Sequence, residues 1–97
     1  MQEPINNQLI RYLEDEEFIR NDTPMTKEII RHEIIRLLRI REGDTVLDIG
    51  SGTGSVSIEA ARLHPSVRVC SVEINPKACE CMRNNIAKFG RVKGEQK

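Results

Sequence analysis

The chain has 97 residues, of which 31% are charged and 38% hydrophobic, a composition that fits one soluble globular domain at most. Fifteen lysines and arginines balance fifteen aspartates and glutamates, so the net charge of zero gives no reason to expect a nucleic acid partner. No apolar run approaches the roughly 20 residues of a membrane span, and the N-terminus lacks the features of a signal peptide, so we expect a cytoplasmic protein without a membrane partner.

Residues 1–25 are polar and mixed, and they predict a solvated N-terminal arm with one short helical turn. Pro24 prevents a long helix from beginning earlier, whereas Thr26 can cap one and Glu28 suits its first turn. We therefore predict two parts, the arm and a domain part that spans residues 26–97.

The first long helix is predicted to bury one apolar stripe, because apolar residues recur at helical spacing. The residues of this stripe are Ile30, Ile34, Leu37 and Leu38. Those predicted to face mostly away from it are Arg31, His32, Arg36 and Arg39. A turn at 42–44 then ends the helical pattern.

Two short runs of β-branched and aliphatic residues, 45–49 and 67–72, predict buried strands of a parallel sheet. A helix over about 55–64 connects them, and Pro65 ends it because proline cannot continue the helical hydrogen bonds. Strands that alternate with helices predict an α/β fold with right-handed crossovers.

A third helix is predicted to begin at Pro76, with Asn75 as its cap, and to stop at Gly90. The last seven residues, 91–97, are mostly polar and predict no strand.

The first strand runs into a glycine loop, and together they read Asp48-Ile49-Gly50-Ser51-Gly52-Thr53-Gly54. Glycines at a strand-to-helix turn allow positive φ and let a ligand approach the bare main chain. Glu73 ends the second strand, which in this fold places a carboxylate beside the loop, where it can accept both hydroxyls of a ribose. The pattern therefore predicts a nucleotide-type cofactor.

The spacing of the glycines distinguishes two such cofactors. Dinucleotide sites usually read G-x-G-x-x-G, whereas here the third glycine comes one residue earlier and Asp48 precedes the loop. S-adenosylmethionine has no phosphate and a cationic sulfonium, so it tolerates a carboxylate that would repel a pyrophosphate. We therefore expect S-adenosylmethionine rather than NAD, bound by Asp48, Gly50, Ser51, Gly52, Thr53, Gly54 and Glu73.

Three segments resemble the decarboxylating precorrin-6Y methyltransferases of cobalamin biosynthesis: Pro24 to Glu28, Val46 to Ala61, and Glu73 to Pro76. The resemblance implies a Rossmann-like class I methyltransferase fold, S-adenosylmethionine as methyl donor, a tetrapyrrole substrate and a homo-oligomer, commonly a tetramer. It adds Thr26 to the cofactor contacts. It also implies that residues 26–97 are the N-terminal, cofactor-binding part of that domain, truncated after the second strand and the third helix.

Three other functions remain open from the sequence. The first is another class I methyltransferase that acts on tRNA or protein, although the neutral charge argues weakly against tRNA. The second is a non-catalytic S-adenosylmethionine-binding fragment or interaction module, whose exposed sheet edge would pair with another chain. The third is an NAD-dependent oxidoreductase, which the glycine spacing disfavours.

Neither a catalytic nor a metal-binding residue is predicted. Methyl transfer from a sulfonium mainly requires that donor and acceptor be held in line, so we assign no catalytic base. Cys79 and Cys81 lie two apart on a helix and point to nearly opposite faces, so we expect these thiols and Cys70 to be reduced and packed. His32 and His64 are expected on the solvated surface.

Overall fold

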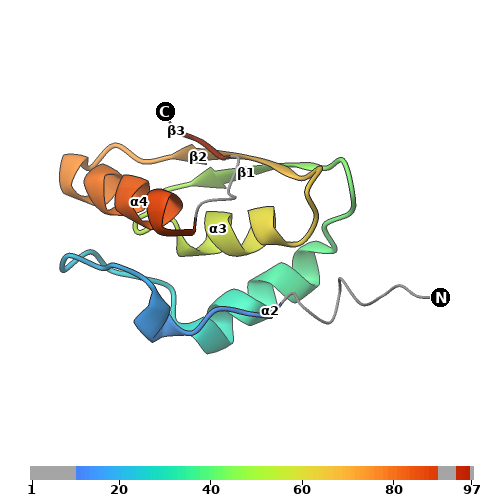
Figure 1. Cartoon of the computed structure of the whole chain (residues 1–97), viewed down its shortest axis with the longest axis horizontal. Helices are drawn as coiled ribbons and strands as arrows, with labels where there is room; N and C mark the ends of the chain where they lie inside the picture. Colours follow the sequence, from blue (N-terminus) through green and yellow to red (C-terminus); the bar gives the residue numbers. More distant parts are fainter. Residues whose placement is uncertain (1–10, 90–93, 97) are drawn as a thin grey trace.

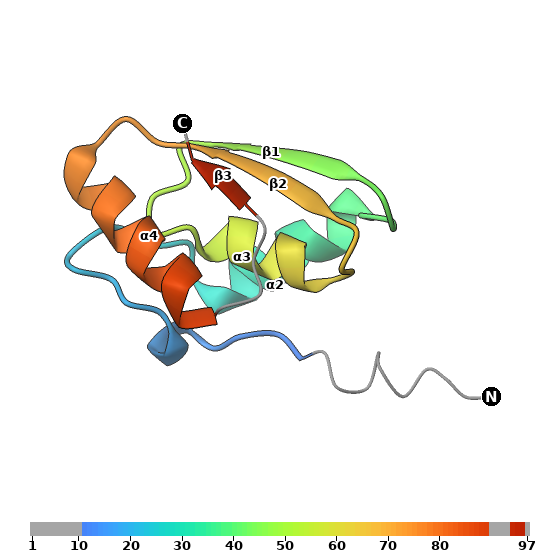
Figure 2. The same cartoon turned by 45° about the horizontal axis from the view of Figure 1, so that its top comes forward.

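The sheet has three parallel strands, and its middle strand pairs with both neighbours. The computed structural model describes residues 11–89 and 94–96 of the chain. The strands lie in the order β1 (Thr45–Ile49), β2 (Arg68–Val72) and β3 (Gly94–Gln96), as Figure 2 shows. β1 and β2 pair in register along their whole lengths, so both end at the same edge of the sheet. The predicted parallel α/β arrangement is confirmed.

β3 corrects two predictions, that residues 91–97 hold no strand and that the sheet stops at two strands. Its sequence, Gly-Glu-Gln, has no β-branched or aromatic residue, so its pattern alone does not indicate a strand. It forms because the open edge of β2 offers backbone N–H and C=O groups that need partners. The predicted helix stop at Gly90 lies outside the described residues.

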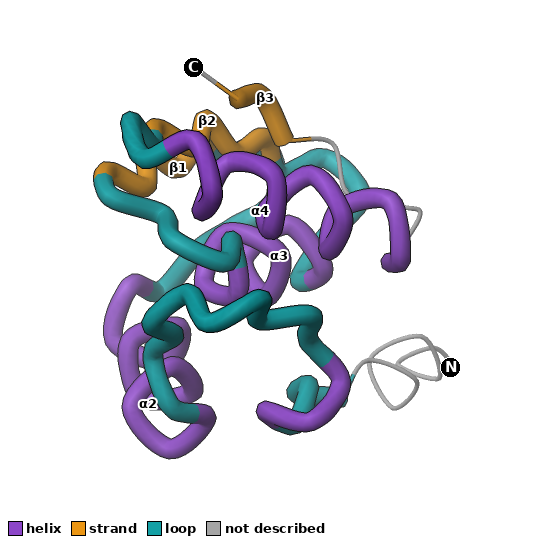
Figure 3. The backbone as a smooth tube through the Cα atoms, turned by 90° about the vertical axis from the view of Figure 1, so that its left-hand side faces the viewer, coloured by secondary structure: helices purple, strands orange, loops and turns teal. Residues whose placement is uncertain are grey.

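Three helices lie on one side of the sheet (Figure 1). α3 (Ser55–Arg62) lies between the sheet and α2 (Glu28–Leu38), and α4 (Pro76–Phe89) lies beside α3 (Figure 3). Two groups of buried side chains form the core, one of Ile35, Ala60, Val67 and Val69 and one of Leu13, Phe18 and Ile58. Within residues 11–89 and 94–96, no helix has the length and apolar character needed to cross a bilayer.

β1 is half-buried on one face and exposed on the other, which corrects the prediction of a buried strand. Side chains alternate along a strand, so Val46 packs into the core beneath the sheet and Asp48 reaches α3. Leu47 and Ile49 point to the opposite side, where they are 61% and 74% exposed. That side carries none of the helices of the described residues.

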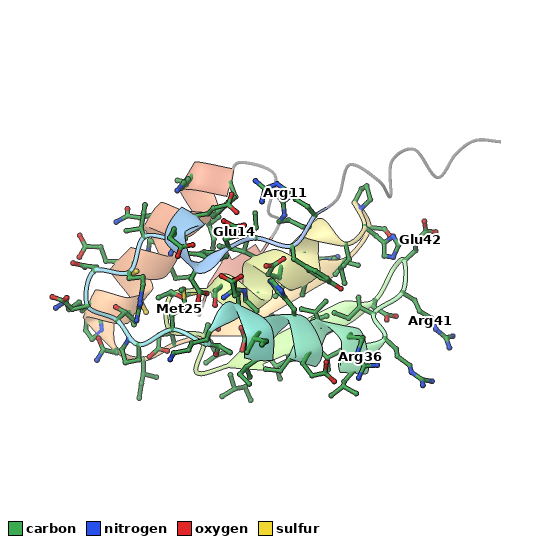
Figure 4. All side chains as sticks on the ribbon, turned by 90° about the horizontal axis from the view of Figure 1, so that it is seen from below. Arg11, Glu14, Met25, Arg36, Arg41 and Glu42 are labelled. Carbon is green, nitrogen blue, oxygen red and sulfur yellow. The ribbon has the colours of Figure 1, made fainter. Side chains whose placement is uncertain are left out.

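α2 packs through a different face from the one predicted. Its buried residues are Arg31 and Ile35. The predicted stripe is mostly exposed, since Ile30, Leu37 and Leu38 face solvent and Ile34 is half-buried. The predicted outward position of Arg36 is confirmed, and Figure 4 shows this side chain at the surface.

The predicted cap of α2 is wrong. Lys27, with an extended backbone, is the N-cap residue, and no side chain caps the helix. Thr26 instead presents its carbonyl oxygen to Arg31 Nη1 at 2.8 Å. Thr26 therefore ends the segment that precedes the helix.

Residues 11–26 form a strap that packs across α3 and α4 (Figure 3), which corrects the prediction of a solvated arm. Leu13, Phe18 and Thr23 of the strap are buried. The predicted short helical turn is confirmed as η1, a single 3-10 turn over Asp15–Glu17. Residues 1–10 of the predicted arm lie outside the described residues.

A buried ion network fastens the strap to the helices. Arg31 is fully buried, and its Nε lies 3.2 Å from Oε1 of Glu59, a buried residue of α3. Arg31 also donates to Asp15 Oδ1 at 3.0 Å and to Leu13 O at 2.7 Å, while Leu13 N donates to Glu59 Oε1 at 2.8 Å. A buried charge is tolerated when it is paired and hydrogen-bonded. The strap thus explains why an arginine occupies the buried face of α2.

The two histidines differ in their surroundings. His64 is half-buried, and its Nδ1 lies 3.9 Å from the exposed Glu42, which Figure 4 shows at the turn before β1. His32 stacks on Tyr12 with 4.4 Å between ring centroids, and its Nε2 lies 3.0 Å from Leu13 O. The prediction of a freely solvated His32 is therefore wrong, because the strap covers its ring.

Glu17 should make the internal structure of the strap, and with it the stability of the protein, sensitive to acid. Its carboxylate accepts from Arg11 at 2.7 and 2.8 Å and from the Glu14 amide at 2.8 Å. The Arg11 guanidinium, followed by that amide, lowers the pKa of Glu17 from 4.5 to about 2. Because the folded-state pKa is the lower one, this stabilisation is complete above pH 4.5 and is lost as the pH falls toward about 2.

We expect the urea midpoint of the wild type to fall more steeply than that of Glu17→Gln as the pH is lowered from 4.5 toward about 2, as followed by circular dichroism. Glu16→Gln, at an exposed neighbouring position, is the matched control and should follow the wild type. Parallel curves for the wild type and Glu17→Gln would contradict this assignment.

Candidate cofactor site

The glycine loop, residues 50–54, joins the end of β1 to the start of α3. Gly50, Gly52 and Gly54 have φ of +75°, +59° and +85°, a left-handed region in which side chains are strained. Gly54 also lacks room for a side chain, because a Cβ there would lie 2.7 Å from Met82 Cγ on α4. A Cβ on Gly52 would lie 3.2 Å from Pro24 O of the strap. The predicted need for glycine is confirmed.

Most N–H groups of the loop are bonded within the protein. Gly50 and Ser51 donate to the last carbonyl oxygen of β2 at 2.7 and 3.1 Å, and Gly54 donates to Ser51 O at 2.9 Å. Gly52 donates to Glu73 Oε1 at 2.8 Å. Four of the five N–H groups thus already have acceptors. The loop therefore does not present the open set of amides that binds phosphate groups.

Glu73 lies against the glycine loop, as its place after the second strand predicts. Its Oε1 accepts from Gly52 N at 2.8 Å and its Oε2 from Asn75 N at 3.0 Å. These bonds, that from Asn75 first, lower the pKa of Glu73, so the carboxylate is charged at neutral pH. A carboxylate oxygen has two lone pairs, so both oxygens can still accept hydroxyl groups. The juxtaposition is confirmed, and cofactor binding by Glu73 remains a prediction.

Asp48 faces the interior beneath the loop. Ser57 Oγ donates to Asp48 Oδ2 at 2.6 Å and lies 2.5 Å from Ser71 Oγ on β2. This chain of polar groups joins β1, β2 and α3 directly under the glycine loop. Sequence reasoning missed Ser57 and Ser71, although a serine among the apolar residues of α3 was a visible signal.

Two further predicted residues bond within the loop region. Ser51 Oγ donates to Asp48 O at 2.8 Å. Thr53 is buried, its Oγ1 accepts from Ser55 N at 3.3 Å, and its carbonyl oxygen accepts from Asn85 Nδ2 at 3.0 Å. Both residues therefore hold the shape of the loop, whatever they contact in a ligand.

The strap forms a wall beside the loop. The atoms nearest to a Cβ placed on Gly52 would be Pro24 O, at 3.2 Å, and Thr23 Cγ2, at 3.9 Å. Thr26, the strap residue predicted to touch the cofactor, follows them and is half-buried. Its role as a ligand remains a prediction.

The cysteines are free, in agreement with the prediction of reduced, packed thiols. Cys81 is buried, which raises the pKa of its thiol, and its Sγ donates to Ile19 O at 2.8 Å. Cys79 Sγ donates to Glu73 O at 3.0 Å. Across the part of the chain that the structure describes, no group of three or more His, Cys, Asp or Glu side chains could hold a metal ion.

This arrangement favours a ligand with a sugar and without phosphate. The carboxyl ends of β1 and β2 bring together bare main chain, a charged carboxylate and the wall of the strap. Glu73 can accept ribose hydroxyls, whereas a pyrophosphate would meet this negative charge and few free amides.

The sequence matches a known protein family over most of its length. The family described as a precorrin methyltransferase domain matches residues 17–96. Over 78 residues the chain is 41% identical to the cobalt-precorrin-6B C(15)-methyltransferase (decarboxylating) of Salmonella typhimurium, a match that covers 79% of this chain and 41% of the relative. The chain thus spans about two fifths of the length of this curated relative.

Solved structures confirm the predicted Rossmann-like class I methyltransferase fold. A precorrin-6y C5,15-methyltransferase from Geobacter metallireducens has a TM-score of 0.84 and 32% identity, and the match covers 91% of this chain and 47% of that one. An RNA methyltransferase from Salinibacter ruber, solved in complex with S-adenosyl-L-homocysteine, has a TM-score of 0.69 and 29% identity, and covers 76% of this chain and 48% of that one.

Proposed function

This chain belongs to the precorrin methyltransferase family, and from that premise we propose that residues 26–97, with the strap packed on them, form the cofactor-binding part of an S-adenosylmethionine-dependent methyltransferase. The observation that carries the proposal is the bond from Gly52 N to the Glu73 carboxylate in a loop whose amides are mostly occupied. S-adenosylmethionine has ribose hydroxyls and no phosphate, so it suits this site better than a dinucleotide. The relative crystallised with S-adenosyl-L-homocysteine supports the same choice.

Each predicted site residue has a distinct part in this proposal. The main chain of the glycine loop would lie along the ligand, and Glu73 would accept the ribose hydroxyls through lone pairs that Gly52 and Asn75 leave free. Thr26 would contact the ligand from the strap. Asp48 would act indirectly, by holding α3 under the loop through Ser57.

We propose that the methyl acceptor is a tetrapyrrole of corrin-ring biosynthesis, because the Salmonella and Geobacter relatives are both named as methyltransferases of a precorrin. The proposal includes decarboxylation, which the name of the Salmonella relative states. S-adenosylmethionine supplies a methyl group already activated on a sulfonium sulfur. The protein then mainly has to hold donor and acceptor in line, which can contribute about 7–11 kcal/mol to lowering the barrier. The proposal includes a homo-oligomer, a tetramer by resemblance, and no nucleic acid partner.

Removal of the Glu73 carboxylate tests the cofactor assignment. Glu73→Ala should weaken the binding of S-adenosylhomocysteine about 5- to 150-fold, because the ribose hydroxyls lose an acceptor worth about 1–3 kcal/mol. Isothermal titration calorimetry measures the change. Glu80→Ala, an exposed carboxylate on α4, is the matched control and should bind like the wild type.

Glu73→Gln refines the test. It keeps the length of the side chain and one acceptor oxygen but loses the charge, so its affinity should lie between those of the wild type and Glu73→Ala. Equal affinity of Glu73→Ala and the wild type would remove Glu73 from the site. Absence of binding by the wild type would overturn the proposed function.

A further inference from the structure

Asn85 is a buried polar residue of α4 whose side chain bonds to two distant segments. Its Oδ1 accepts from Ile19 N at 2.6 Å, and its Nδ2 donates to Ile19 O at 2.7 Å and to Thr53 O at 3.0 Å. The side chain is 0% exposed. The Asn85 amide therefore pairs with both the N–H and the C=O group of Ile19 in the strap, as a neighbouring strand would. It also bonds to the glycine loop at Thr53 O.

The strap needs such an anchor, because its backbone is strained just after Ile19. Asn21 and Asp22 have φ of +50° and +62°, a left-handed conformation that non-glycine residues adopt at a cost. Asn85 holds the segment on one side of this turn, and on the other side Pro24 O lies where a side chain on Gly52 would be crowded. The turn carries an open cavity lined by Arg20, Asn21, Asp22 and Pro24.

We propose that Asn85 is a positioning residue that fixes the distance between the strap and the glycine loop, and so sets how closely the strap approaches a ligand bound along the loop. The proposal rests on the proposed function for the identity of the ligand, S-adenosylmethionine or its demethylated product. Cys81 also reaches Ile19 O, at 2.8 Å, but a thiol is a weak donor and does not contact the loop in these bonds. Of these two residues, only Asn85 bonds to both the strap and the glycine loop.

Asn85→Asp is the sharpest probe, because it keeps the shape and the acceptor but removes the donor. The new carboxylate would face the carbonyl oxygens of Ile19 and Thr53 and repel both. Thr53 O would lose this donor, and Ile19 O would keep only the weak thiol donor of Cys81. We expect the strap to separate from the loop and S-adenosylhomocysteine to bind about 10- to 100-fold more weakly. Calorimetry measures the affinity.

Two controls separate positioning from general loss of stability. Asn84→Asp places the same charge on the exposed side of α4 and should bind as the wild type does. Val67→Ala opens a cavity in the core near the start of β2, at the opposite end of the sheet from the loop, and should lower the melting temperature without lowering affinity.

A second measurement needs no ligand. The amide resonances of Gly50, Gly52 and Gly54 report the loop directly in a nitrogen–proton correlation spectrum. Asn85→Asp should move them while both controls leave them in place. Wild-type affinity and unmoved glycine resonances in Asn85→Asp would overturn the proposal. If the wild type itself binds no S-adenosylhomocysteine, the proposed function fails, and the glycine resonances then decide the positioning role independently.

Discussion

Arg31→Met is expected to destabilise the protein by about 3–5 kcal/mol, because it leaves the buried Glu59 carboxylate without its cation. The same change removes the donors to Leu13 O and to the Thr26 carbonyl, so the strap loses bonds at both of its ends. Urea unfolding followed by circular dichroism gives the free energy. Loss of the strap should also weaken the binding of S-adenosylhomocysteine.

Two variants test the reason for this loss. Arg36→Met removes an arginine of the same helix that pairs with Glu33 at the surface, and its stability should stay close to that of the wild type. Arg31→Met combined with Glu59→Met removes both buried charges, so it should recover part of the lost stability. A loss for Arg31→Met no greater than for Arg36→Met would show that the buried network contributes little.

Gly54→Ala is expected to lower the free energy of unfolding by about 2–5 kcal/mol. About 1–2 kcal/mol comes from forcing alanine to adopt a left-handed backbone, which Gly54 has at φ +85°. A further 1–3 kcal/mol, roughly, comes from overpacking, since the new Cβ would lie 2.7 Å from Met82 Cγ in the core. Urea unfolding measures the sum, and calorimetry should show weakened ligand binding because the loop must shift.

Gly43→Ala separates the two contributions. Gly43 has φ of +83°, nearly that of Gly54, but a Cβ there meets no atom within 4 Å. Gly43→Ala should therefore lower the free energy of unfolding only by the cost of the left-handed backbone, about 1–2 kcal/mol. Similar losses at both positions would mean that Met82 yields easily and that packing does not determine the residue at position 54.

The central part of the fold could be predicted because its signals are local. β1 has the predicted bounds, and α3 begins at the predicted Ser55. Asn75 accepts from the amides of Lys77 and Ala78 at 2.9 and 3.1 Å, so the predicted cap of α4 is confirmed. The position of Glu73 followed from the topology alone, since parallel strands place their carboxyl ends at one edge.

What failed depended on partners distant in sequence. Periodicity ranks Arg31 as a surface residue, and only Glu59 and the strap, far from it in the sequence, make its burial favourable. Asn85 has the same character, because its partners Ile19 and Thr53 lie 66 and 32 residues away. Hydrophobic patterns do not encode such polar pairings. They therefore assign the wrong buried face to α2 and do not reveal the hydrogen bonds that Asn85 of α4 makes to Ile19 and Thr53.

The occupied amides of the glycine loop have a consequence for selectivity. Because residues 50–54 already satisfy most of their own donors, the main chain there needs little rearrangement before it receives a ligand, and it has little capacity to attract anions. Recognition of a nucleoside at this site would then depend on sugar chemistry more than on charge. The site would then distinguish nucleosides by the ribose hydroxyls that the Glu73 carboxylate can accept. A 2′-deoxy analogue of the ligand would therefore bind more weakly.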